Sequence, residues 1–319
     1  MPHPYAALDP VAVLDALESA GFRGDGRLLP LNSYENRVYQ VYLEDNSSVV
    51  AKFYRPGRWS AAQIAEEHAF AKELAEREIP MVAPILSGKF REFIFAVYPR
   101  RGGRPPELGD PKVLEWIGRF LGRIHAVGAT QPFRERPALN QETFGREPRA
   151  FLLQSGFVPA ELLESWKAVT EQALAGVARC FSLAGEPSQI RLHGDCHPGN
   201  ILWTPDGPHF VDLDDARSGP AMQDLWMLLS GDRASMSQAL SDVLAGYEQF
   251  RQLDRRELNL VEALRTLRLI HYSAWIARRW DDPAFPAAFP WFDSTRYWQD
   301  RILELREQIA LMEEEPLRV

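Results

Sequence analysis

The spacing of hydrophobic and polar positions predicts a mixture of helices and strands at the start of the chain. Residues after Asp9-Pro10 have the spacing of a helix that ends at Gly21, with the aspartate as N-cap and the proline at the first helical position. Alternating apolar and polar positions then predict strands. The three strand-like segments are 27–34, 37–43 and 49–54.

A second helix is predicted at 60–77. Ser60 and Gln63 have the spacing of a capping box. The apolar positions of this segment recur at helical intervals, at Ile64, Ala71, Leu74 and Ala75. Another strand is predicted at 91–98. The first part of the chain is therefore predicted to form a small sheet with two helices.

The pattern changes at 99–106, where prolines flank Gly102-Gly103. Beyond this break most apolar positions have helical spacing. Helices are predicted at 110–128, at 159–180 and in four segments from Pro220 onward, and short strands at 189–193 and 209–213. We therefore predict a small lobe at 1–98, a hinge at 99–106 and a larger, mainly helical lobe at 107–319.

Composition and charge limit the classes of function. The chain has 319 residues, with 36 Lys and Arg against 44 Asp and Glu, which gives a net charge of −8. This acidic balance argues against nucleic acid or an anionic membrane as a partner. The longest aromatic and aliphatic run, 93–98, is far shorter than the roughly 20 residues that a membrane helix needs.

Two further features bear on the cellular compartment. Asp9, Asp15 and Glu18 occupy the region where a signal peptide would need an apolar segment. The two cysteines of the chain, Cys180 and Cys196, make no disulfide framework and suit a reducing environment. We therefore expect a cytoplasmic protein, and we expect it to be a monomer.

The residues that could carry chemistry concentrate in two neighbouring segments, 192–200 and 211–215. The ends of two predicted strands deliver Asp195, Asn200 and Asp212 to one place. Asp195 and Asn200 are five positions apart, as are the Asp and Asn of the kinase catalytic loop. In phosphoryl transfer one carboxylate accepts the proton of the attacking hydroxyl, while a carboxylate and an amide oxygen hold Mg²⁺. The spacing predicts Asp195 and Asp212 as catalytic residues and Asn200 and Asp212 as ligands of Mg²⁺.

The pattern H-G-D-x-x-x-x-N, followed by an Asp on the next strand, resembles the aminoglycoside phosphotransferase and choline kinase group. The longer segments 193–232, 274–280 and 283–291 are similar to the stress response kinase A family of Ser/Thr protein kinases. The resemblance implies an α+β, protein-kinase-like fold of two lobes, with an antiparallel sheet and a helix in the smaller lobe. It also implies ATP as co-substrate, Mg²⁺ as cofactor and transfer of phosphate to Ser or Thr of proteins, including the chain itself.

The kinase resemblance predicts nucleotide-binding residues in the first lobe. Lys52 lies in Val-Val-Ala-Lys-Phe, which is like the strand lysine segment of kinases. Glu67 borders the apolar face of the following helix, whereas Glu66 lies about 100° away around it. Glu67 is therefore the predicted partner of Lys52.

The remaining residues that are predicted to contact ATP lie in the loop at 32–36 and at the end of the strand at 91–98. The loop over the phosphates is expected at 32–36, which contains no glycine, so backbone N–H groups and the Ser33 hydroxyl are the predicted contacts. Val97 and Tyr98 lie on the strand that leads into the hinge, and they are predicted to bind adenine through their backbone. Asp212 is followed by Pro220 after only eight positions, which leaves no room for the long activation loop of protein kinases.

Several residues keep two interpretations. Asp214 is either a second metal ligand or a solvated carboxylate, and Cys196 is either a redox sensor or inert. Asp224 is predicted to tie down the catalytic loop, and Asp215 is either a surface residue or the ion-pair partner of Arg217. One group of late aromatic residues either stacks on a ligand or packs in the core: Trp275, Trp280, Phe285, Phe289, Trp291, Phe292 and Trp298.

Three alternatives to a Ser/Thr protein kinase stay open at this point. A kinase of a small hydroxylated acceptor, such as an aminoglycoside-, choline- or homoserine-like molecule, would use the same motifs. A metal-dependent hydrolase would use His193-x-Asp195-x-His197 as alternating ligands, but it would leave Lys52 and Glu67 unexplained. A kinase-like binding module without activity would also retain the fold.

Overall fold

The computed structural model describes residues 4–185 and 187–319 and divides the chain into two compact units. One unit contains the described residues up to Pro105 together with Gly199–Asp214 and Asp282–Ala284. The other contains Pro106–Pro198, Asp215–Asp281 and Phe285–Val319. The segment after the predicted catalytic loop therefore belongs to the same unit as the N-terminal sheet. The lobe limits predicted at 98 and 107 stay a prediction.

A five-stranded antiparallel sheet forms the centre of the first unit. Its strand order is β1-β2-β3-β5-β4. The bounds are β1 (Gly24–Pro30), β2 (Arg37–Leu43), β3 (Ser48–Phe53), β4 (Leu86–Phe90) and β5 (Phe93–Pro99). This arrangement confirms the predicted antiparallel sheet, whereas β4 was not predicted because its residues lack a regular alternation of apolar positions.

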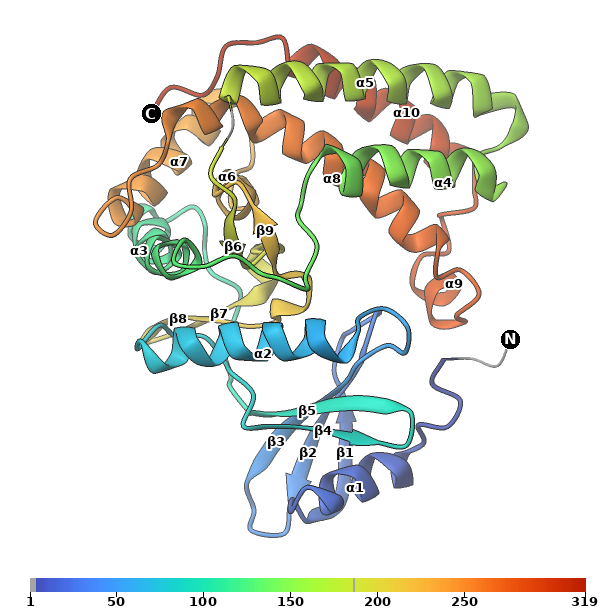
Figure 1. Cartoon of the computed structure of the whole chain (residues 1–319), viewed down its shortest axis with the longest axis vertical. Helices are drawn as coiled ribbons and strands as arrows, with labels where there is room; N and C mark the ends of the chain where they lie inside the picture. The colour runs from blue at the N-terminus through green and yellow to red at the C-terminus, as the bar shows by residue number, and fades with distance from the viewer. Residues whose placement is uncertain (1–3, 186) are drawn as a thin grey trace. The chain divides into compact units, whose positions relative to one another are not determined.

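The two faces of the sheet are covered by different helices (Figure 1). Helix α1 (Pro10–Ser19) packs on the face that carries Val49, Ala51 and Phe53. Helix α2 (Ala61–Glu76), which begins with the predicted capping box at Ser60, covers the opposite face. Because side chains alternate along a strand, Lys52 projects from β3 on the face opposite to Ala51 and Phe53.

A short hairpin completes the first unit. Strands β7 (Ile201–Thr204) and β8 (Gly207–Phe210) pair in an antiparallel manner. Phe210 N donates to Pro80 O at 2.8 Å, and Phe210 O accepts from Val82 N at 2.9 Å. These backbone bonds attach the hairpin to the segment between α2 and β4, although more than 100 residues separate them in the chain.

The second unit is mainly helical. Its helices are α3 (Pro111–Gly128), α4 (Glu147–Ser155), α5 (Leu163–Ala184), α6 (Met222–Trp226), α7 (Arg233–Tyr247), α8 (Val261–Ala277), α9 (Ala284–Ala288) and α10 (Thr295–Leu311). Strands β6 (Ile190–Leu192) and β9 (Arg217–Gly219) pair beside them. Helix α8 packs against α4, α5 and α10. Together with the sheet, this helical unit confirms the predicted α+β class.

The late aromatic residues mostly pack in the core of the helical unit. Phe285, Phe289, Phe292 and Trp298 are buried in one hydrophobic cluster. Trp298 meets Trp166 of α5 edge to face, with ring centroids 5.2 Å apart. Core packing is therefore the correct interpretation for these four residues.

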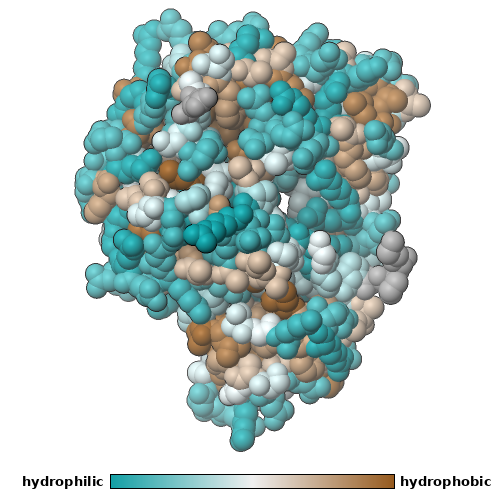
Figure 2. All heavy atoms as spheres, viewed as in Figure 1, coloured by the Kyte–Doolittle hydropathy of each residue, from teal (hydrophilic) through white to brown (hydrophobic). Residues whose placement is uncertain are grey.

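The face of the protein that is seen in Figure 2 is largely polar. Figure 2 shows hydrophilic residues over most of the visible face, with hydrophobic residues in small scattered groups. Within the described ranges, 4–185 and 187–319, no helix is both long enough and apolar enough to cross a membrane.

Helices α3 and α7 approach each other closely enough to require glycine. A Cβ on Gly118 would lie 1.9 Å from the carbonyl oxygen of Val243, and one on Gly246 would lie 1.9 Å from that of Glu115. A backbone oxygen cannot rotate away as a side chain can. The two helix axes must therefore separate if either glycine gains a side chain.

We expect Gly118→Ala to lower the free energy of unfolding by about 1–3 kcal/mol, because one added methyl overpacks the contact between α3 and α7. Urea unfolding measures this loss. Gly109→Ala is the matched control, since a Cβ there meets nothing within 4 Å. Equal stability of the two variants would contradict the close packing.

Candidate active site

Lys52 is the centre of a buried cluster of charges in the first unit. Its ammonium Nζ lies 2.8 Å from Asp212 Oδ1, 3.1 Å from Asp214 Oδ1 and 3.6 Å from Glu67 Oε1. The ion pair with Glu67 is the one expected from the position of Glu67 on the apolar border of α2. The helix and the segment after β8 therefore both supply carboxylates to one strand lysine.

The three carboxylates keep Lys52 charged. Burial by itself would lower the pKa of Lys52, but Asp212, Asp214 and Glu67 outweigh it and raise that pKa well above its usual value. The side chain of Lys52 is only 7% exposed, whereas that of Asp212 is 49% exposed. Asp212 is therefore the member of the cluster whose oxygens can reach a bound molecule.

Asp212 and Asn200 lie at the same end of the β7–β8 hairpin. Asn200 precedes β7 and Asp212 follows β8, and Val211 N donates to Asn200 O at 3.0 Å. Asp212 has a φ of +63°, a left-handed conformation that is uncommon outside glycine and that concentrates at functional sites. The hairpin thus brings the two predicted metal ligands together.

A second buried network lies behind Glu67. Tyr54 Oη is 2.9 Å from Glu67 Oε1, 2.8 Å from His68 Nε2 and 3.1 Å from Tyr98 Oη. Burial and the charge of Glu67 raise the pKa of both tyrosines. Both hydroxyls therefore stay protonated, and the network holds the Glu67 carboxylate in place.

The other residues that were predicted to contact the nucleotide lie in β5 and in the loop between β1 and β2. Val97 is buried in β5, and its carbonyl accepts from Ile85 N at 2.7 Å. Tyr98, in the same strand, pairs in register with Val50. Ser33 is half-buried in the glycine-free loop between β1 and β2.

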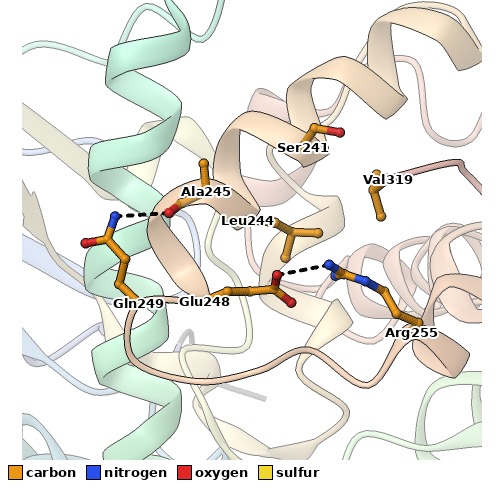
Figure 3. A pocket seen from close by; sticks show the side chains of 7 residues that line it. All are labelled: Ser241, Leu244, Ala245, Glu248, Gln249, Arg255 and Val319. Carbon is orange, nitrogen blue, oxygen red and sulfur yellow. Dashed lines mark hydrogen bonds and ion pairs between the residues drawn. The ribbon is translucent and has the colours of Figure 1, made fainter.

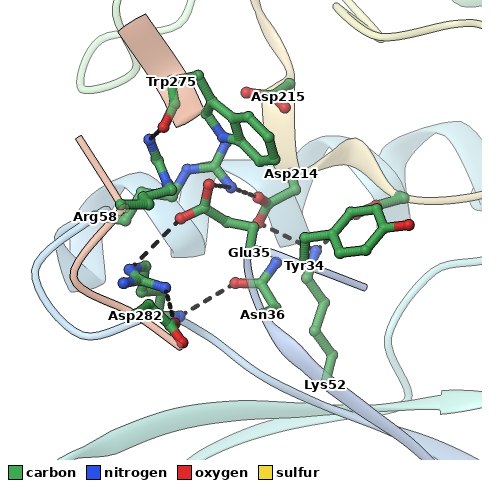
Figure 4. A network of polar contacts seen from close by, with 12 residues as sticks. Tyr34, Glu35, Asn36, Lys52, Arg58, Asp214, Asp215, Trp275 and Asp282 are labelled. Carbon is green, nitrogen blue, oxygen red and sulfur yellow. Dashed lines mark hydrogen bonds and ion pairs between the residues drawn. The ribbon is translucent and has the colours of Figure 1, made fainter. Parts of the chain in front are cut away.

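That loop is anchored by charged residues that the sequence pattern did not reveal. Glu35 is 7% exposed, and Arg58 Nη1 lies 3.5 Å from its Oε2. Arg58 also donates to Asp214 Oδ2 (Figure 4). Asp214, which is only 4% exposed, is therefore held between Arg58 and Lys52, and the solvated interpretation of this residue was wrong.

A further ion pair continues this network. Arg55 Nη1 donates to Asp282 Oδ2 at 2.7 Å, and Arg55 N donates to Asn36 Oδ1 at 3.1 Å. Burial would raise the pKa of Asp282, but its hydrogen bond from Arg55 lowers it. Arg55 and Arg58 precede the N-cap of α2, where no periodic pattern exists, so sequence reasoning had no signal by which to find them.

The second unit contains the predicted catalytic Asp195. Arg268 Nη1 of α8 donates to Asp195 Oδ1 at 2.7 Å, and His197 Nε2 lies 3.5 Å from Asp195 Oδ2. Arg268 was not predicted, because its partner Asp195 is 73 positions away in the chain. Asp195 is thus flanked by two nitrogen-bearing side chains.

Asp224 holds the loop that carries Asp195. Its Oδ2 accepts from His193 N and its Oδ1 from Gly194 N, both at 2.8 Å, and His125 Nε2 lies 2.9 Å from Oδ2. Burial would raise the pKa of Asp224, but the hydrogen bond from His125 and the neighbouring donors lower it. The predicted role of Asp224 in tying down this loop is confirmed.

The loop that carries Asp195 packs closely against its neighbours. Gly194 has a φ of +86°, and a Cβ there would lie 2.1 Å from Asp215 O. Arg217 Nη2 lies 3.1 Å from Asp215 Oδ1, which agrees with the ion-pair interpretation of Asp215. Cys196 is fully buried, and burial raises the pKa of its thiol well above the usual value. A protonated, inaccessible thiol argues against a redox sensor.

A separate cavity lies on the second unit (Figure 3). It has a volume of about 460 Å³ and is lined by Ser241, Leu244, Ala245, Glu248, Gln249, Arg255 and Val319. Glu248 and Arg255 form an ion pair of 2.9 Å in its wall. None of the predicted site residues lines this cavity.

Comparison with known proteins agrees with this fold. The model of the phosphotransferase enzyme family matches residues 27–261. Stress response kinase A of Escherichia coli (strain K12) is 44% identical, over 99% of this chain and 97% of that protein. The protein named serine/threonine protein kinase RdoA of Salmonella typhimurium (strain LT2) is 43% identical over the same shares.

Solved structures share the fold at much lower identity. Amicoumacin kinase, in a complex with AMP-PNP and Ca²⁺, has a TM-score of 0.71 at 18% identity, covering 95% of this chain and 94% of its own. A microcompartment-associated aminopropanol kinase has a TM-score of 0.67 at 17% identity, covering 96% and 97%. Choline kinase LicA of Streptococcus pneumoniae has a TM-score of 0.63 at 15% identity, covering 89% and 93%.

A sheet lysine paired with a helix glutamate, followed by the Asp195, Asn200 and Asp212 pattern, defines a phosphotransferase of the protein-kinase-like fold. The chain belongs to the phosphotransferase enzyme family and, within it, to the stress response kinase A family. This membership overturns the hydrolase alternative.

We expect Asp224→Asn to lower the free energy of unfolding by about 3 kcal/mol at neutral pH, because it breaks a fully buried pair with His125. A carboxyl with a lowered pKa stabilises the fold above its unfolded pKa, about 3.9, and loses that contribution as pH falls through its folded pKa. The difference from wild type should therefore shrink below about pH 4. Urea unfolding across pH measures it, with the exposed Asp206→Asn as control. A constant difference down to pH 3 would contradict this account.

We expect Arg58→Ala to destabilise the protein by about 3 kcal/mol, because it leaves the buried Asp214 carboxylate with one cation fewer. Adding Asp214→Asn should recover part of this loss, and a double-mutant cycle in urea unfolding measures the coupling. Arg77→Ala, which removes an exposed pair with Glu73, is the control and should cost less than about 1 kcal/mol. Strictly additive effects of the Arg58 and Asp214 changes would refute the coupling.

Proposed function

We propose that this protein is an ATP- and Mg²⁺-dependent kinase that phosphorylates Ser or Thr of proteins, including itself. The observation that carries the proposal is the position of Lys52, held by Glu67 and Asp212 within one unit. Asn200 lies at the same hairpin end as Asp212, and Asp195 precedes Asn200 by five positions. These are the residue types and the order that phosphoryl transfer requires.

Lys52 is assigned to the phosphates of ATP. Its ammonium is kept charged by surrounding carboxylates, and Glu67 fixes its direction from the α2 side. The Ser33 hydroxyl and the backbone of the 32–36 loop are assigned to the same phosphates. Val97 and Tyr98 are assigned to adenine through backbone groups, because their side chains pack within the first unit.

The donor set at the hairpin end fits a hard divalent cation. Asp212 offers a half-exposed carboxylate and Asn200 an amide oxygen, and Mg²⁺ prefers oxygen ligands of this kind together with phosphate oxygens. When bound, Mg²⁺ would neutralise negative charge on the phosphates. Asp214 is not assigned as a ligand, because Arg58 and Lys52 already engage both of its oxygens.

Asp195 is assigned to the acceptor hydroxyl. Its carboxylate orients the hydroxyl and accepts its proton as the oxygen bonds to the γ-phosphorus of ATP. The bond from that phosphorus to the β,γ-bridging oxygen breaks, and ADP leaves. Asp224 and Gly194 position the loop, so the precision of Asp195 depends on buried hydrogen bonds beneath it.

Two observations support a protein acceptor in the cytoplasm. The relatives that cover the chain at 43–44% identity are named stress response kinase A or serine/threonine protein kinase. Both cysteines are free thiols in the structure, which suits a reducing compartment. We extend the proposal to a cytoplasmic monomer.

Transfer from γ-labelled ATP with Mg²⁺ tests the proposal. We expect label on Ser or Thr of the protein itself and of added proteins. Asp195→Ala should lower transfer by about 10²–10⁴-fold, because it removes the proton acceptor, while ATP still binds. Asp212→Ala should abolish transfer together with Mg²⁺-dependent ATP binding. Asp206→Ala, an exposed change in the β7–β8 turn, is the matched control.

Other results of this transfer assay would contradict one part of the proposal each. Label only on small hydroxylated acceptors would keep the site and replace the protein acceptor. Bound ATP without transfer to any acceptor would favour a binding module. Undiminished transfer by Asp195→Ala would refute the role given to that residue.

A further inference from the structure

Arg268 contacts the proposed catalytic aspartate directly and is also accessible. Its Nη1 lies 2.7 Å from Asp195 Oδ1, and 36% of its side chain is exposed. A guanidinium has five N–H donors in a planar fork, and this bond uses one of them. An arginine in this position can therefore contact an anionic group on the molecule that brings its hydroxyl to Asp195.

Several arginines lie close to this part of α8. Burial, together with Arg217, Arg268 and Arg278, holds the pKa of His271 well below its usual value, although Asp215 opposes the shift. The carboxylates in this region each have a cationic neighbour. Asp195 has Arg268, and Asp215 has Arg217 at 3.1 Å.

These charges favour an acidic acceptor over a cationic one. A cationic acceptor would need carboxylates beside Asp195, but Asp195 pairs with the guanidinium of Arg268 and lies 3.5 Å from the His197 imidazole. Burial lowers the pKa of Arg278, and the negative charge of Glu147 opposes this shift. Bringing a second cation next to Arg268 would be repulsive, whereas an acidic group would find a donor.

One face of α8 continues from Arg268 along the helix. Positions 268, 272 and 275 are separated by four and three residues, so they share a face of α8, and Arg279 lies in the turn that follows the helix. Tyr272 and Trp275 are half-buried and stacked, with ring centroids 5.7 Å apart and an interplanar angle of 15°. Arg279 lies over Trp275 at 5.2 Å and donates to its carbonyl at 2.9 Å.

We infer that this surface, defined by Arg268, Tyr272 and Trp275 of α8 and by Arg279 of the turn after it, selects an acidic Ser- or Thr-containing peptide segment as the acceptor. Arg268 binds an acidic residue beside the reactive hydroxyl, the two rings pack on the following residue, and Arg279 attracts a second acidic residue. The inference rests on the proposed function and specifies its substrate.

The length of the face suits a peptide. The rise along α8 from Arg268 to Ala277, where the helix ends, is about 14 Å at 1.5 Å per residue, and Arg279 follows in the turn beyond it. An extended strand covers this helical part with about four residues at roughly 3.3 Å each. A small alcohol could contact Arg268 alone, whereas a peptide spans both arginines.

Binding of labelled peptides tests the inference independently of transfer. Three fluorescein-labelled peptides of equal length, each with a central Ser and with Glu, Gly or Lys flanks, are titrated against the full chain with a non-hydrolysable ATP analogue. We expect the acidic peptide to bind at least about tenfold more tightly than the basic one. Arg268→Glu should weaken binding of the acidic peptide by at least about tenfold and should favour the basic one.

Two further variants separate recognition from folding. Arg268→Lys retains the charge and should keep most of the preference for the acidic peptide. Arg296→Glu makes the same change of charge at an exposed position of α10, where the side chain is 89% exposed, and should bind all three peptides as wild type does. Circular dichroism and ATP binding verify that each variant folds.

The two proposals fail in different ways. Equal binding of the three peptides, preference for the basic one, or unchanged acidic binding by Arg268→Glu would overturn the inference, even if peptides are phosphorylated. Preferred binding of the acidic peptide, with γ-labelled phosphate transferred only to small alcohols, would overturn the protein acceptor but retain the charge selectivity of Arg268.

Discussion

The structure of the first unit depends on keeping one buried lysine charged. An ammonium that is 7% exposed is costly to desolvate, and the fold offsets this cost with Glu67, Asp212 and Asp214. Those carboxylates come from a helix and from a segment about 150 residues later in the chain. The ion pairs of Lys52 therefore hold α2 and the segment after the β7–β8 hairpin against β3.

The same requirement explains how a loop without glycine can be ordered here. Arg58 bridges Asp214 and Glu35, so the loop after β1 is linked to the carboxylates around Lys52. In kinases with a glycine-rich loop the backbone itself approaches the phosphates. In this chain side-chain charge holds the corresponding segment. Loss of Arg58 would therefore remove the link between this loop and the carboxylates around Lys52.

The second unit holds the loop that carries Asp195 through buried contacts while the carboxylate itself stays partly exposed. Asp224 is buried beneath the loop and satisfies two backbone N–H groups, whereas Arg268 and His197 contact the carboxylate from its exposed side. The buried contacts position the residue, and the partly exposed Arg268 sets the charge beside its carboxylate. These are separable functions, because they involve different side chains on different elements.

Sequence alone determined the α+β class, the capping box at Ser60 and the pairing of Lys52 with Glu67, because strand alternation and helical phase are local properties. The strands β4, β7 and β9 escaped prediction, since short strands carry little periodic signal. Arg58, Glu35 and Arg268 also escaped it. Their partners are distant in the chain, and only the tertiary structure brings opposite charges together, so no local spacing could reveal them.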